Sequence, residues 1–187
     1  MEAIEIKFLE LKQRITKEGL LEKSPLYYTY KSCVAFAMLV ASIFIFIALP
    51  TPWIRMLDAV FLAIAYIQIG LIAHDIAHHQ VFRSPKTYQF FGILFWNLAL
   101  GASFGYWNKK HNAHHANPNQ IGKDMDIGQH MIFIQNQYAH AHPIFKKLHR
   151  YQQFYFFPML SLGSFSVITQ SIKFFIRDAK ERKRIPF

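Results

Sequence analysis

Two short stretches organise this chain: His74-Asp75-Ile76-Ala77-His78-His79 and His111-Asn112-Ala113-His114-His115. Together they hold six of the ten histidines. Within each stretch, histidines recur three or four residues apart, a spacing that places side chains on one face of a helix. Neutral imidazole is the commonest metal ligand in proteins. The pattern therefore predicts that the two stretches converge and form a metal site made of nitrogen ligands alone.

The ligand type limits the metal. Nitrogen ligands suit zinc, copper, iron or nickel, and they do not suit magnesium or calcium. A zinc protease needs His-Glu-x-x-His with the Glu as general base, and neither stretch contains that Glu. Structural zinc sites usually include thiolates, but the single cysteine, Cys33, lies in an apolar run. We therefore predict redox-active iron or copper.

The remaining histidines carry less weight. His79 is the weakest of the six, because it lies about 100° round the helix from His78. Four others are scattered through a polar stretch and are interpreted as solvated loop residues: His130, His140, His142 and His149.

The composition indicates a membrane protein of one domain. Of the 187 residues, 52% are hydrophobic and 17% are aromatic, which is too apolar for an ordinary soluble domain. One cysteine allows no internal disulfide. The net charge of +10 does not favour nucleic acid, because the basic residues flank apolar runs. Anionic lipid head groups are the favoured partner, and acyl-CoA phosphates come second.

The segment 33–73 is predicted to form a transmembrane hairpin. Residues 33–49 contain one polar residue, Ser42, and nearly span a hydrocarbon core as a helix. Pro50-Thr51-Pro52 then breaks the helix. Residues 56–73 form the return run, interrupted by Asp58 and Gln68. The competing interpretation is a pair of buried helices in a soluble protein.

Charge orients the hairpin. Six basic residues precede it and Arg83 and Lys86 follow it, whereas the turn carries only Arg55. Under the positive-inside rule, both ends of the hairpin are cytoplasmic. Residues 1–31 are then a cytosolic N-terminal segment, in which an amphipathic helix is predicted. The first histidine stretch emerges on the cytoplasmic side of the membrane.

Two further apolar runs are predicted to lie in the membrane interface. If both histidine stretches serve one site, the chain between them crosses the membrane an even number of times. Two crossings need about 40 residues, and only 31 separate His79 from His111. The run 88–106 is therefore predicted to lie flat or to dip and return. Residues 154–176 are interpreted similarly, because a crossing would place the basic C-terminus outside.

The fold class predicted is all-α. It is a helical integral membrane protein with one transmembrane hairpin, interfacial helices and a cytosolic histidine-rich cap. The histidine-box cap covers 74–150, and an interfacial segment with a basic tail covers 151–187.

The motifs resemble one known family. His74-Asp75-x-x-His78-His79, Trp107-Asn108-Lys109-Lys110-His111-Asn112-x-His114-His115, Asn117-Pro118-Asn119 and Asp124-Met125-Asp126 together resemble the membrane fatty-acid desaturases. Within them, the pattern is most similar to the bacterial linoleoyl-CoA or Δ6-type acyl-CoA desaturases. The resemblance runs from about Pro25 onward.

The resemblance implies a fold, a cofactor and partners. It implies a di-iron centre that uses O2 to introduce a cis double bond into a fatty-acyl chain, with electrons from ferredoxin or cytochrome b5. It implies no catalytic residue beyond the metal ligands, which would be His74, His78, His79, His111, His114 and His115. Of these, His79 has a second interpretation, in which it contacts a ligand residue and does not bind the metal itself. Candidates to support the ligands are Asp75, Asn117, Asp124 and Asp126.

The chain also departs from the family pattern. The family has a third histidine box and a second transmembrane hairpin, and neither is present. Residues 1–187 are therefore interpreted as an incomplete desaturase domain, an N-terminal half whose partner would be a missing C-terminal half. Three alternatives remain open: a split or decayed non-catalytic relative, a related di-iron hydroxylase, and a membrane protein that handles metals.

Overall fold

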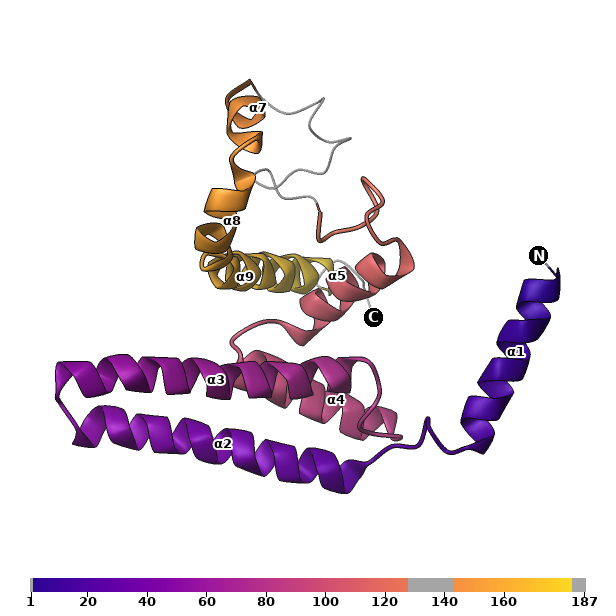
Figure 1. Cartoon of the computed structure of the whole chain (residues 1–187), viewed down its shortest axis with the longest axis horizontal. Helices are drawn as coiled ribbons and strands as arrows, with labels where there is room; N and C mark the ends of the chain where they lie inside the picture. The colour runs from indigo at the N-terminus through magenta and orange to yellow at the C-terminus, as the bar shows by residue number, and fades with distance from the viewer. Residues whose placement is uncertain (1, 128–142, 183–187) are drawn as a thin grey trace. The chain divides into compact units, whose positions relative to one another are not determined.

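All regular elements in the described part of the chain are helical. In a computed structural model, residues 2–127 and 143–182 are described. Figure 1 labels the helices α1 (Glu2–Lys17), α2 (Pro25–Ala48), α3 (Pro52–Ala77), α4 (Pro85–Ile93), α5 (Phe104–Ala116), α7 (Pro143–His149), α8 (Gln152–Leu160) and α9 (Gly163–Arg182). A π-helix, Leu94–Ala99, follows α4. The all-α prediction is confirmed. The chain divides into two compact units, 1–91 and 92–187.

The first unit is built on the α2–α3 hairpin. The two helices lie side by side and antiparallel (Figure 1), and Pro52 begins α3 directly after the turn. Small side chains pack between them: Ala35, Ser42 and Ala65 are buried. Small residues allow close approach of two helices inside a membrane, where burial of apolar surface gives little driving force.

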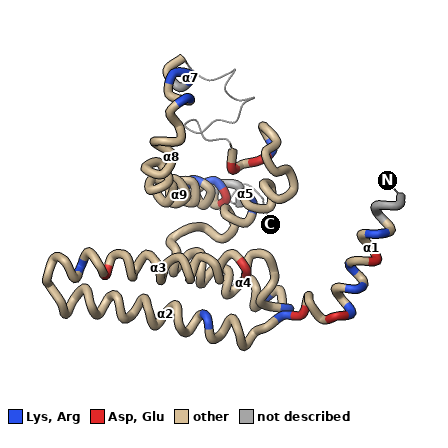
Figure 2. The backbone as a smooth tube through the Cα atoms, viewed as in Figure 1, with Lys and Arg blue, Asp and Glu red and all other residues tan. Residues whose placement is uncertain are grey.

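The outer faces of α2 and α3 are apolar and exposed. Large apolar side chains cover them, among them Val40, Phe44, Ile47, Leu57, Val60, Ile64, Ile67 and Leu71. Figure 2 shows few charged residues along either helix. Both helices are long and apolar enough to cross a membrane. The predicted transmembrane hairpin is confirmed. The helix α2 begins well before the predicted run 33–49 and ends one residue short of its end, and α3 extends beyond the run 56–73 at both ends.

The run 88–106 is sharply bent. The segment Pro85–Ala99 makes an angle of 104° with α5. The bend follows the π-helix, where Ala102 N–H donates to Trp96 O, and Gly101 takes a φ of +69° that side-chain-bearing residues rarely adopt. Asn97 Oδ1 then accepts a hydrogen bond from Phe104 N–H. The polar residues that interrupt this run in sequence therefore build its corner.

The second unit joins α9 to the start of α5. Ser103 caps α5, since its side chain accepts a hydrogen bond from Tyr106 N–H. Ser103 N–H donates in turn to Oγ of Ser171, which is buried on α9. The helices α8 and α9 meet at a bend of 58°. The apolar run 154–176 is thus two helices with a break.

Four histidines outside the two stretches were predicted to be solvated loop residues. His130, His140 and His142 lie outside the described residues. The loop prediction is wrong for His149, which is the last residue of α7.

Candidate metal centre

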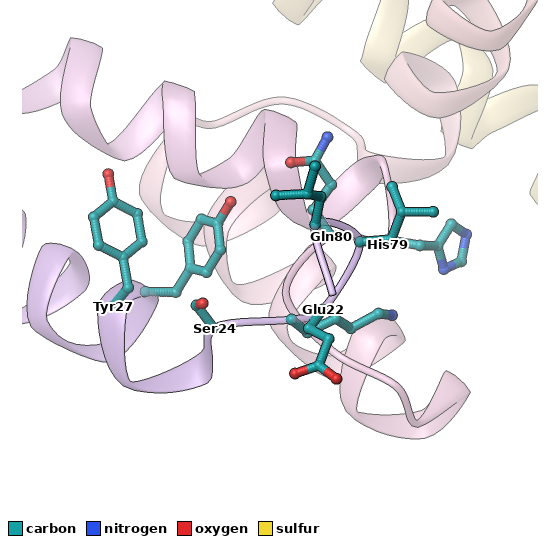
Figure 3. A pocket seen from close by; sticks show the side chains of 9 residues that line it. Glu22, Ser24, Tyr27, His79 and Gln80 are labelled. Atoms are coloured by element: carbon teal, nitrogen blue, oxygen red, sulfur yellow. The ribbon is translucent and has the colours of Figure 1, made fainter. Parts of the chain in front are cut away.

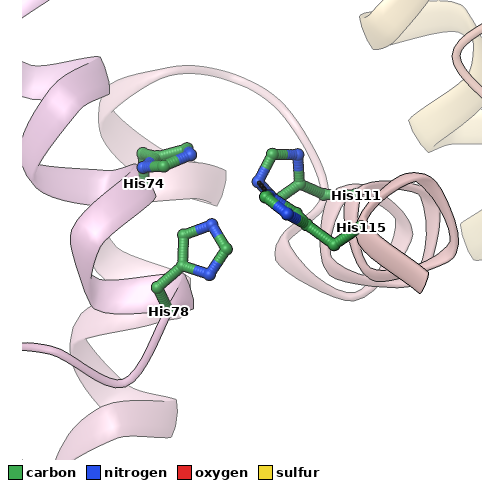
Figure 4. Close-up of side chains that lie close together, drawn as sticks. All are labelled: His74, His78, His111 and His115. Carbon is green, nitrogen blue, oxygen red and sulfur yellow. Dashed lines mark hydrogen bonds between the residues drawn. The ribbon is translucent and has the colours of Figure 1, made fainter. Parts of the chain in front are cut away.

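The last turn of α3 carries the first histidine pair. His74 and His78 lie on one face of the helix, with ring centroids 4.5 Å apart. Each offers a nitrogen within 4.8 Å of the other. Figure 4 shows both side chains projecting from α3. The i, i+4 spacing thus produces the paired imidazoles that it predicts.

Asp75 connects this pair to the neighbouring helix. Its Oδ1 lies 3.4 Å from Nδ1 of His74, and its Oδ2 accepts a hydrogen bond of 3.0 Å from Tyr28 Oη on α2. Carboxylates that contact a ligand imidazole fix its orientation and raise its basicity. Asp75 is in place for such a role, and Tyr28, which the sequence did not single out, holds its other oxygen.

His79 lies apart from the His74–His78 pair. It follows the end of α3 with a φ of +57°, and its ring stacks on Tyr88 at a centroid distance of 3.8 Å. It lines a hollow of about 550 Å³ together with the linker between α1 and α2 (Figure 3). His79 is therefore not among the residues whose nitrogens meet those of His74 and His78.

The helix α5 carries the second pair. Nε2 of His111 and Nε2 of His115 face each other at 3.0 Å, and Figure 4 shows both rings projecting from α5. Two nitrogen ligands at metal distances of about 2.0–2.1 Å lie about 3 Å apart when they subtend ordinary coordination angles. The spacing of this pair therefore fits two ligands of one ion.

A stack of aromatic rings supports His111. Trp107 lies 4.2 Å from the His111 ring and 4.1 Å from Trp96, both as stacked pairs. Trp96 is buried. Trp107 belongs to the second histidine motif but was given no role from sequence, although its position four residues before His111 indicates that both lie on one helix face.

His114 contacts a buried carboxylate. Its Nδ1 lies 2.7 Å from Oδ2 of Asp124, whose side chain has no exposed surface. Burial raises the pKa of the Asp124 carboxyl, but hydrogen bonds from Asp126 N–H, His114 and Asn119 N–H outweigh this and hold the pKa below its ordinary value. The carboxylate is therefore ionised near neutral pH.

Asn117 and Asp126 make other contacts. Asn117 caps the end of α5, and its N–H donates to Ala113 O and His114 O. Asp126 forms an ion pair with Lys110 and lies 3.8 Å from Nδ1 of His114. Asn117 thus makes a turn, as the sequence alone also allowed.

The donors in these clusters fit iron. Among the described residues, four of these five imidazoles are partly exposed and that of His115 is exposed. Carboxylates contact two of the five rings. Imidazole suits iron, copper, nickel and zinc. An outer ring of carboxylates is what metal-binding histidines ordinarily have. These imidazoles and carboxylates are therefore of the kinds that hold a metal ion.

Comparisons with known proteins point to one family. Residues 51–186 match the sequence profile of a family described as Fatty acid desaturase. The Delta(8)-fatty-acid desaturase of Euglena gracilis is 32% identical over 177 residues, which cover 94% of this chain and 41% of that protein. The Acyl-lipid (9-3)-desaturase of Physcomitrium patens is 30% identical over 161 residues, 82% of this chain and 31% of the relative.

A third relative is also a desaturase that matches most of this chain. The Delta(6)-fatty-acid desaturase fat-3 of Caenorhabditis elegans is 28% identical over 177 residues, 91% of this chain and 39% of that protein. The chain spans 41% or less of the length of these three relatives. No solved structure matches the chain.

Proposed function

Because the chain belongs to the fatty acid desaturase family, we propose that it serves the O2-dependent introduction of a cis double bond into a fatty-acyl chain at a di-iron centre. The observation that carries the proposal is the pair of imidazoles on α5, whose nitrogens face each other at the spacing of two ligands of one ion. The relatives named as Delta(8) and Delta(6) desaturases support a front-end type of desaturation.

Ligand number supports a shared centre. The pair on α3 offers two nitrogens, the pair on α5 offers two more, and His114 offers a fifth. An ion that is bound by two imidazole nitrogens alone would be coordinated mostly by water, so neither pair is sufficient by itself to hold an iron ion firmly. We propose that His74, His78, His111, His114 and His115 bind iron together, and that His79 lies behind them. Bound iron would supply the activation of O2 and the removal of two hydrogens.

The chain's own residues would hold and orient this centre. Trp107 supports one ring by stacking, and Asp75 and Asp124 contact two others. The hairpin anchors the first pair at one end of a membrane-spanning helix, where an acyl chain can approach from the bilayer. The acyl group would be carried by coenzyme A or by a lipid, and ferredoxin or cytochrome b5 would donate electrons.

The test of function is expression in a host that lacks its own desaturase. Fatty acids are read by gas chromatography in two arms, the chain alone and the chain together with the part of the Euglena gracilis relative that it does not match. We expect a new unsaturated fatty acid in at least one arm. A hydroxylated product would favour the related hydroxylase, and no product in either arm would favour a non-catalytic relative.

The ligand assignment has a separate test. His111→Ala is expected to abolish the retention of iron in protein purified in detergent, because it removes one of the two facing nitrogens on α5. His149→Ala on α7 is the matched control and should keep its iron. Iron content is measured by elemental analysis, and unchanged iron in the His111 variant would remove this residue from the ligands.

A further inference from the structure

The Asp124 carboxylate accepts three hydrogen bonds and lies outside the proposed ligand set. Its Oδ2 accepts hydrogen bonds from Asn119 N–H at 2.8 Å and from His114 at 2.7 Å, and its Oδ1 accepts one from Asp126 N–H at 2.8 Å. An ionised carboxylate has acceptors only. Nδ1 of His114 must therefore carry the hydrogen in this contact, which leaves the lone pair on Nε2.

The loop after α5 is folded so that this carboxylate reaches His114. Asn117 ends the helix, and Gln120 N–H donates back to Asn117 O. Asn119 then takes a φ of +61°, a conformation that asparagine tolerates better than most residues. Asp124 N–H donates to Gln120 O, which turns the Asp124 side chain inward. The sequence separation of ten residues between His114 and Asp124 is bridged by this loop.

We propose that Asp124 is a positioning residue: it fixes His114 as the Nδ1–H tautomer and directs Nε2 to the metal, and the loop 117–126 folds to deliver its carboxylate. This inference rests on the proposed function, because it assumes the metal centre that is proposed there. It assigns one purpose to two motifs, Asn117-Pro118-Asn119 and Asp124-Met125-Asp126, that sequence alone explains equally well as local turns.

The competing arrangement is direct metal binding by His114, Asp124 and Asp126. Their ligand atoms lie within 4.8 Å of one another. However, both oxygens of Asp124 already accept hydrogen bonds from groups within its own loop or from His114, and Asp126 is paired with Lys110. A cation bound there would compete with the His114 N–H for Oδ2 of Asp124 and with Lys110 for Asp126, so positioning is the favoured role.

The first test reads the tautomer without metal. The full chain is labelled with ¹⁵N-histidine and studied by NMR in detergent micelles, well above the ordinary imidazole pKa of about 6.5. The His114 signals are identified by their loss in His114→Gln. We expect the Nδ1–H form in the wild type and a shift toward the Nε2–H form in Asp124→Ala. Lys123→Ala, an exposed change in the same loop, should leave the tautomer unchanged.

Asp124→Asn guards against a folding defect in the alanine variant. The amide keeps one acceptor and the shape of the carboxylate, so the loop is retained while the hold on His114 weakens. We expect a mixture of both tautomers. An Nε2–H form of His114 in the wild type would overturn the proposal, as would an unchanged Nδ1–H form in both Asp124 variants.

The second test measures metal affinity with Co²⁺ as the probe. Asp124→Asn is expected to weaken binding roughly 10–100-fold, the usual loss when a carboxylate behind a histidine ligand is removed, and Asp126→Asn to weaken it less. Equal losses, with a changed Co²⁺ absorption spectrum in both variants, would indicate direct ligation and overturn the positioning role. If the wild type bound no Co²⁺, the proposed function would fail, while the tautomer would still decide the link between Asp124 and His114.

Discussion

The ring of Trp107 is the residue-scale feature that most directly supports a proposed ligand. It is stacked between Trp96 and His111. Each aromatic stack contributes about 0.5–1.5 kcal/mol beyond the area it buries, so the two together are worth about 1–3 kcal/mol. The stack also restricts the rotation of the His111 ring, which favours a fixed position for its Nε2.

Trp107→Ala should therefore lower the stability of the second unit by about 1–3 kcal/mol from the lost stacks alone. Trp107→Phe is the matched control, because it retains a ring and should lose less. Denaturation in detergent, followed by circular dichroism, measures both. Equal stability of the alanine variant and the wild type would contradict a structural role for the stack.

At the scale of elements, the corner after α4 depends on close packing of Gly92 and Phe104. A Cβ at Gly92 would lie 2.4 Å from two atoms of the Phe104 ring, and that ring is buried. Gly92→Ala is therefore expected to destabilise the protein by about 1–3 kcal/mol, the usual cost of overpacking. Gly163→Ala is the control, since no atom lies within 4 Å of its Cβ. A Gly92 variant as stable as the Gly163 variant would contradict the packing argument.

One hydrogen bond between α9 and the start of α5 is made by the Ser171 side chain. Ser171→Ala removes the oxygen that accepts from Ser103 N–H and leaves this half-buried donor without its protein acceptor, at a cost of about 0.5–1.5 kcal/mol. Ser164→Ala, on the exposed part of the same helix, should have little effect. The melting temperatures of the two variants in detergent decide this, and equal values would show that the hydrogen bond contributes nothing.

Sequence alone predicts those elements whose pattern is local. The hairpin follows from apolar runs of membrane length, and the histidine pairs follow from the i, i+4 spacing. Helix geometry also places His79 on another side of the helix than His78 and so makes it the weakest candidate ligand. The resemblance named Asp124 as a candidate to support the ligands, but its partner His114 could not be predicted, because the contact depends on the path of the loop between them. The corner after α4 could be predicted only in part. Asn97 and Gly101 interrupt the apolar run in the sequence, but the hydrogen bond from Phe104 N–H to Asn97 Oδ1 cannot be read from the sequence.

At the scale of the whole molecule, the proposed shared centre requires an even number of membrane crossings between the two histidine pairs. Lys86 and Lys109 flank the chain segment between them and are exposed. If both pairs bind the same iron centre, these two lysines lie on the same side of the membrane. The positive-inside rule further predicts that this side is cytoplasmic, and that Trp53 at the start of α3 lies outside.

Single cysteines at these positions test the requirement. In a Cys33→Ser background, Trp53→Cys should react with a membrane-impermeant maleimide in intact spheroplasts, whereas Lys86→Cys and Lys109→Cys should react only after permeabilisation. Reaction of both lysine positions from outside would reverse the orientation but keep the shared centre. Reaction of Lys86→Cys and Lys109→Cys from opposite sides would exclude a shared centre, because imidazoles on opposite faces of a hydrocarbon core about 30 Å thick cannot bind the same ion.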